Sequence, residues 1–74
     1  MKISVSALGS IREYLPEPKD VILDESICLS ELKRIAGIPA ATAVSYVVNG
    51  RVQNGKYTVQ DNDAVKFIMI VGAG

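Results

Sequence analysis

The sequence predicts an α+β fold in which a single helix covers one face of a sheet. Two observations indicate this: β-prone runs lie near both ends of the 74-residue chain, and one segment of helical spacing lies between them. Strands flanking one helix are typical of α+β domains. We expect one domain over residues 1–74, burying only about 60% of its unfolded surface. Such a domain has little room for an enclosed active site, which favours a carrier, binding module or subunit over an enzyme.

The first 24 residues predict two paired strands. Residues 2–8 alternate between apolar and polar side chains, as in a half-buried strand. Gly9 ends this run, and residues 11–14 are expected to form a short helical turn before a proline-containing loop. Residues 20–24 include a Val-Ile-Leu run and predict a second strand, paired with the first as a hairpin. The predicted core face of the first strand holds Ile3, Val5 and Ala7.

The helix is predicted over residues 29–36 and ends before Gly37. Its N-cap is less defined, because Cys28 occupies the position where Ser or Thr is expected, and Ser26 and Ser30 are rival caps. Its charges suit the helix dipole: Glu31 lies in the first turn, and Lys33 and Arg34 lie near the end.

A β-hairpin is predicted over residues 44–53. Residues 44–48 are strongly β-prone and end at Asn49-Gly50, which favours a type I′ turn because both residues tolerate positive φ. Residues 51–53 would start the returning strand. Residues 57–59 are expected to be a brief extended or irregular stretch.

The last predicted strand is central in the sheet. Residues 61–63 predict a turn, with Asn62 in the left-handed conformation. Residues 64–71 are apolar on both faces apart from Lys66, a pattern that indicates a strand with neighbours on both sides. The predicted sheet therefore has four to five strands.

Composition excludes several classes of function. Eight basic and eight acidic residues give a formal net charge of zero, and no basic run is present to bind nucleic acid. No apolar stretch approaches the roughly 20 residues that span a bilayer, and no leader is visible, so a cytoplasmic location is expected. The chain has no histidine and one cysteine, Cys28, which argues against zinc sites and Cys-His nucleophiles. We expect no bound metal or cofactor and a structural role for Cys28.

The segment Gly72-Ala73-Gly74 carries the candidate chemistry. Small residues after a central strand can thread a narrow cleft, and we expect residues 72–74 to be a flexible functional tail. A glycine carboxylate has no side chain to crowd an attacking atom. ATP can activate such a group as an acyl-adenylate, from which a sulfur or nitrogen nucleophile displaces AMP. A frayed end without function is the alternative.

Four segments, in order, resemble the MoaD/ThiS sulfur-carrier family. Residues 8–15 (LGSIREYL) resemble the region after the first strand in the molybdopterin synthase small subunit, which typically has an Arg-Glu pair. Residues 30–32 are similar to the family's helix opening, 47–51 to its valine-rich strand and "VNG" turn, and 61–65 to its "DGDxV" entry to the last strand. The resemblance covers essentially the whole chain and implies a ubiquitin-like β-grasp fold with a mixed sheet.

The resemblance also implies a mechanism. An E1-like adenylating enzyme would activate Gly74 with ATP, and a sulfur donor protein would convert it to a thiocarboxylate. In the MoaD branch the tail enters a large molybdopterin synthase subunit, and in the ThiS branch the sulfur enters thiazole. The Arg12-Glu13 pair favours the first. The family usually ends Gly-Gly, whereas this chain has Ala73 at the penultimate position.

Two further functions stay open: a protein modifier whose Gly74 is joined to a lysine amine, and a non-catalytic interaction domain with an idle tail. In every case the chain is expected to be a monomer when free.

Partner contacts are predicted on the last strand. Ile68 and Ile70 should share a face with Lys66, opposite the face that the helix covers, and exposed apolar patches often mark partner contacts. Arg12 is a candidate contact at the rim. There are structural alternatives to partner binding. Other strands could cover the two isoleucines, and the single charged side chains could simply be solvated.

Overall fold

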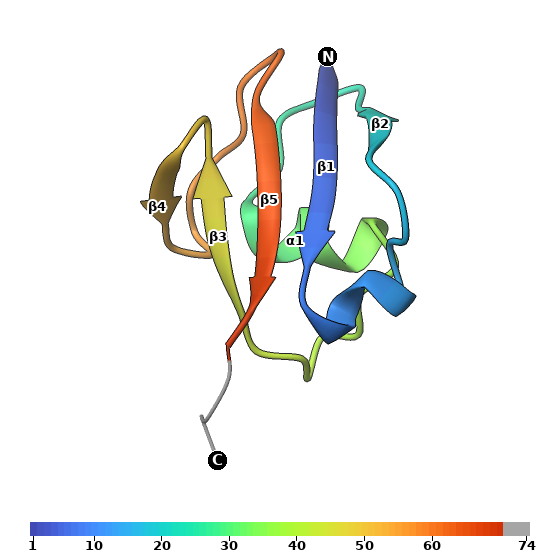
Figure 1. Cartoon of the computed structure of the whole chain (residues 1–74). Coiled ribbons are helices and arrows are strands. Elements are labelled where there is room, and N and C mark those ends of the chain that lie inside the picture. The colour runs from blue at the N-terminus through green and yellow to red at the C-terminus, as the bar shows by residue number, and fades with distance from the viewer. Residues whose placement is uncertain (71–74) are drawn as a thin grey trace.

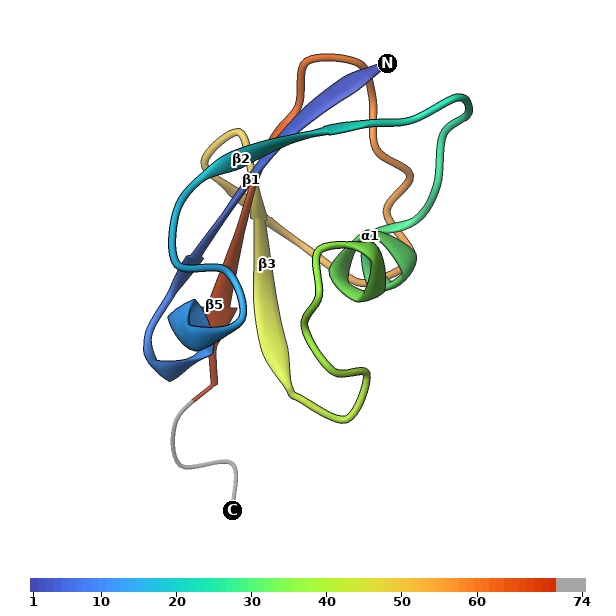
Figure 2. The same ribbon diagram turned by 90° about the vertical axis from the view of Figure 1, so that its right-hand side faces the viewer.

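The computed structural model describes residues 1–70 and shows a five-stranded sheet with one α-helix packed on one face (Figures 1 and 2). The strands lie in the order β2-β1-β5-β3-β4. This is the predicted α+β, β-grasp arrangement. In chain order the elements are β1 (Lys2–Leu8), the 3-10 helix η1 (Ser10–Glu13), β2 (Lys19–Ile22), α1 (Leu29–Ile35), β3 (Val44–Val48), β4 (Arg51–Gln53) and β5 (Ala64–Met69).

β5 is the central strand, as its apolar sequence predicts. It pairs in parallel with β1 and antiparallel with β3. In this register Ser6 lies opposite Lys66 on one side, and Val47 lies opposite Lys66 on the other. Because β1 and β5 run in the same direction, both strands end at the same end of the sheet (Figure 1).

The core lies between the sheet and α1. The predicted inward residues of β1 are buried, and Val65 and Phe67 of β5 lie beside them, with Phe67 fully excluded from solvent. The Phe67 ring packs edge-on against Tyr46 at a centroid distance of 5.9 Å. Full burial of one such side chain stabilises the fold by about 1.5–3 kcal/mol. The helix contributes Leu29 and Leu32 to the same core.

Some predicted boundaries differ from the structure. β2 covers Lys19–Ile22 rather than residues 20–24, although the Leu23 amide still donates to the Met1 carbonyl at 2.8 Å. α1 ends at Ile35, with Ala36 as its C-cap and Cys28 as its N-cap. The Cys28 side chain makes no capping hydrogen bond. The described part of the last strand ends at Met69, and Val71 lies outside the described residues.

The predicted turns are present. Asn49 and Gly50 both have positive φ, 51° and 84°, as a type I′ hairpin turn requires. Asn62 also adopts the left-handed conformation, with φ 70°. Residues 57–59 have more structure than expected, because Thr58 bridges Cys28 and Val59 is completely buried.

A buried carboxylate closes the end of the sheet where β5 begins. Asp63 is 5% exposed, and its side chain accepts hydrogen bonds from the Asn49 amide at 2.8 Å, the Tyr57 hydroxyl at 3.0 Å and the Gln60 backbone amide at 2.8 Å. Burial opposes ionisation of this group, but the Gln60 amide and the two side-chain donors together hold the pKa of Asp63 below its ordinary value. The hydrogen bond from the Tyr57 hydroxyl to the Asp63 carboxylate raises the pKa of Tyr57.

We predict that Asp63→Asn lowers the free energy of unfolding by about 1–3 kcal/mol near neutral pH, because donors that faced a carboxylate lose part of their acceptor. A depressed folded-state pKa stabilises the protein above the unfolded pKa of about 3.9, and this stabilisation is lost as pH falls through the folded value. Urea unfolding at pH 7 and pH 3 measures both effects. The difference between wild type and variant should shrink at pH 3, and an unchanged difference would contradict the assignment.

Candidate functional site

One face of the sheet carries the residues predicted to contact a partner. Lys66 and Ile68 of β5 point away from the face where Val65 and Phe67 are buried against α1. Ile70, which follows β5, is 44% exposed. Lys66 and Ile68 therefore share the outer face, as predicted, although Ile68 is half-buried. The role of all three residues in binding stays a prediction.

Lys66 is surrounded on this face by small and apolar side chains. Its register neighbours are Ser6 on β1 and Val47 on β3. The other lysine of the same face, Lys2, has a carboxylate partner in Asp20 at 3.6 Å. A depression of about 200 Å³ lies around Lys66. It is lined by Ser4, Val5, Ser6, Pro18, Val47, Asn49, Gly50, Ala64, Val65 and Lys66.

Leu8 is a member of this apolar face that the sequence analysis missed. The register sets Leu8 of β1 beside Ile68 of β5, and the Leu8 side chain is 45% exposed. The alternation of residues 2–8 already contains this signal, because it places Leu8 on the outer face with the polar residues. Leu8, Ile68 and Ile70, which we call the exit patch, lie at the end of the sheet where β1 and β5 finish.

The end of β5 is held between two backbone segments. On one side Gly9 has φ +85°, and a Cβ built there would lie 3.2 Å from the Cβ of Met69. A side chain at this position would be strained in its backbone and crowded against β5. On the other side the Ile70 amide donates to the Ala43 carbonyl at 3.4 Å. The chain thus leaves the sheet between the end of β1 and the start of β3.

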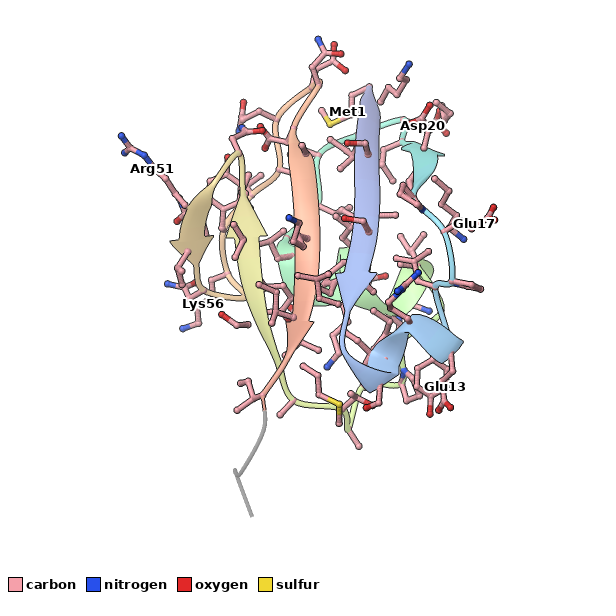
Figure 3. The ribbon with its side chains drawn as sticks, in the orientation of Figure 1. Met1, Glu13, Glu17, Asp20, Arg51 and Lys56 are labelled. Carbon is pink, nitrogen blue, oxygen red and sulfur yellow. The ribbon has the colours of Figure 1, made fainter. Side chains whose placement is uncertain are left out.

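Arg12 lies in η1, directly after β1, and η1 packs against both β1 and β5. The Arg12 side chain is exposed, and its guanidinium donates to the Pro16 carbonyl at 3.5 Å. Arg12 is therefore at the same end of the sheet as the exit patch. Figure 3 shows Glu13 nearby, whereas Arg51 and Lys56 lie at the opposite edge beside β4. These charged side chains therefore lie at two different edges of the sheet.

The tail residues Gly72, Ala73 and Gly74 lie outside the described residues, as does Val71. Their predicted roles stay predictions, and the geometry of the candidate site is that of the chain up to Ile70.

Cys28 is half-buried at the start of α1, with its sulfur 3.2 Å from the Ser30 hydroxyl oxygen. The Ser30 side chain, together with the Glu31 backbone amide, lowers the pKa of the Cys28 thiol.

Within residues 1–70, no three His, Cys, Asp or Glu side chains gather where they could hold a metal ion. No helix in that range is long and apolar enough to cross a bilayer.

Neither a protein-family model nor a curated protein sequence matches the chain. Solved structures do. A protein of Pyrococcus furiosus described as molybdopterin converting factor subunit 1 superimposes with a TM-score of 0.76 at 19% identity, covering 96% of this chain and 99% of the other. SAMP1 of Haloferax volcanii superimposes with a TM-score of 0.74 at 11% identity over 100% of both chains.

A thiamine biosynthesis protein of Geobacter metallireducens has a higher identity, 28%, with a TM-score of 0.61 over 100% of this chain and 88% of the other. The first two superpositions establish the fold. The third structure has the same fold and a higher sequence identity to this chain. The chain therefore has the ubiquitin-like β-grasp fold of the MoaD- and ThiS-like proteins, and the family resemblance of its sequence extends to its three-dimensional structure.

Proposed function

We propose that this protein is a sulfur carrier whose Gly74 carboxylate is adenylated and then converted to a thiocarboxylate. The observation that carries the proposal is the end of β5. The central strand β5, held by β1 and β3, ends beside the exposed side chains of Leu8 and Ile70 and the half-buried side chain of Ile68. The sequence resemblance and the similarity to MoaD- and ThiS-like structures support the same reading.

The chemistry requires little of the carrier itself. A Gly74 oxygen attacks the α-phosphorus of ATP and pyrophosphate leaves, which gives an acyl-adenylate. A persulfide sulfur of the donor protein then attacks the acyl carbon and AMP leaves, which gives an acyl disulfide. A second thiol attacks the donor's sulfur in this disulfide, so that the thiocarboxylate leaves and the two thiol sulfurs end as a disulfide. Adenylation lowers the barrier by turning a poor electrophile into one with a good leaving group. The carrier supplies a reachable carboxylate, and the activating enzyme supplies the nucleotide site.

The proposed partners are an E1-like adenylating enzyme, a sulfur donor protein and a large molybdopterin synthase subunit. The Arg12-Glu13 pair and the similarity to the Pyrococcus furiosus protein favour molybdopterin synthesis. The alternative is a carrier for thiamine-thiazole synthesis, which the 28% identity to the thiamine biosynthesis protein favours. ATP belongs to the adenylating enzyme in either case.

Docking is proposed on the exit patch together with Lys66. Leu8, Ile68 and Ile70 offer apolar area next to the place where the chain leaves the sheet. Lys66 is a cation among neutral neighbours and suits an acidic group on the partner. Arg12 would contact the partner at the rim.

We predict that incubation with the adenylating enzyme, ATP and a sulfur donor raises the intact mass by about 16 Da, because sulfur replaces oxygen at the activated acyl carbon. Electrospray mass spectrometry measures the change. A chain lacking Gly74 is the control and should show no gain, and neither should a reaction without ATP.

Other products separate the alternatives. A conjugate in which Gly74 is joined to a lysine amine would select the protein modifier, and full biological function without Gly74 would select the interaction domain. Absence of any mass gain with an adenylating enzyme that activates its other carriers would contradict the proposal. So would native protein that continues past Gly74 without trimming.

We also predict that Ile70→Ser weakens binding to the adenylating enzyme about tenfold, the effect of losing one well-packed apolar anchor. Ile35→Ser is the matched control, because Ile35 is 42% exposed but lies on α1, away from the open sheet face. Isothermal titration calorimetry measures the affinity of both variants. Equal losses for Ile35→Ser and Ile70→Ser would rule out the exit patch.

We further predict that Lys66→Glu weakens binding to the adenylating enzyme more than Lys66→Met, and that the difference in affinity shrinks at high salt.

A further inference from the structure

Lys33 of α1 is a buried cation that the sequence analysis placed only as a complement to the helix dipole. It is 6% exposed, and its ammonium donates to the Ala40 carbonyl at 3.1 Å and to the Thr42 carbonyl. Lysine is rarely buried to this degree without a carboxylate partner. The two partners found for Lys33 in residues 1–70 are both backbone carbonyls. Lys33 therefore binds a segment of backbone.

The segment that Lys33 holds is the loop of residues 38–43 between α1 and β3. The loop is also tied at its start, because the Ile38 amide donates to the Lys33 carbonyl at 3.2 Å, and across its middle, because the Thr42 amide donates to the Pro39 carbonyl at 3.0 Å. Lys33 thus contacts this loop through both its side chain and its main chain.

This loop borders the place where the chain leaves β5. Thr42, whose carbonyl Lys33 binds, is followed by Ala43, whose carbonyl accepts the Ile70 amide at 3.4 Å. Figure 1 shows the loop before β3 at the same end of the sheet as the end of β5. Displacement of the loop would therefore remove one of the two backbone segments that hold the end of β5.

We propose that Lys33 is a positioning residue for the end of β5: by fixing the loop of residues 38–43, it keeps the Ala43 carbonyl where it accepts the Ile70 amide. This inference rests on the proposed function of Gly74. A segment with a fixed base loses less conformational entropy when it enters a partner's active site. Lys33 therefore lowers the cost of binding the tail and leaves the chemistry at the acyl carbon unchanged.

The first test is amide hydrogen exchange of the free protein, followed by NMR. In Lys33→Met, which keeps an unbranched side chain one heavy atom shorter and removes its donors, the amides of Thr42 and Ile70 should exchange about tenfold faster or more, relative to Val5 and Phe67 as core references. Lys33→Arg retains the charge and donors and should restore part of the protection. It also serves as the test variant if Lys33→Met does not fold.

Asp63→Asn is the matched control, because Asp63 is also a buried charged residue with several partners but lies at the opposite end of β5. It should accelerate exchange at Ala64 without a selective effect at Ile70. Unchanged Ile70 exchange in folded Lys33→Met would overturn the proposal, and so would an equal selective effect at Ile70 in Asp63→Asn.

The second test is ATP–pyrophosphate exchange catalysed by the adenylating enzyme. Lys33→Met should raise KM for the carrier about tenfold with kcat within about twofold of wild type, because only binding of the tail is affected. A fall in kcat at unchanged KM would overturn the positioning role. If the wild-type chain is not adenylated at all, the proposed function fails, and the hydrogen-exchange comparison still decides whether Lys33 fixes the end of β5.

Discussion

The parallel pairing of β1 with β5 is the contact on which the rest of the structure depends. It joins the first and last strands of the chain, places β5 at the centre of the sheet and aligns the ends of both strands. Gly9 can approach Met69 closely because these ends coincide. The exit patch exists for the same reason, since Leu8 and Ile68 are register neighbours. Loss of this pairing would separate Leu8 from Ile68 and from the end of β5.

Much of the fold could be predicted from local patterns. Asn49-Gly50 specified its hairpin because few residues tolerate two positive φ angles in succession. The apolar run of residues 64–71 indicated a central strand because both of its faces had to be covered. The role of residues 57–59 could not be predicted, because the burial of Val59 and the bridge from Thr58 to Cys28 depend on a distant part of the chain.

The candidate site was partly predictable. Alternation along β5 separated Lys66 and Ile68 from Phe67, since successive side chains point to opposite faces. The neighbours contributed by β1 depend on register, which the sequence of one strand does not specify. The burial of Lys33 was also hidden, because helical spacing gives a side chain's direction but not the loop that folds over it. Asp63 is the last residue of the predicted turn, but its burial could not be predicted, because two of its three donors, Asn49 and Tyr57, come from other segments of the chain.

The location of the N-terminus has a practical consequence. Met1 lies at the opposite end of β1 from Leu8, and its ammonium donates to the Leu23 carbonyl at 2.7 Å (Figure 1). The seven residues of β1 separate the two ends of the strand by about 20 Å. An affinity handle or a fluorophore fused ahead of Met1 would therefore stand clear of the exit patch. Such a fusion replaces the ammonium by an amide N–H that can still donate to Leu23, so labelled protein is suited to binding measurements.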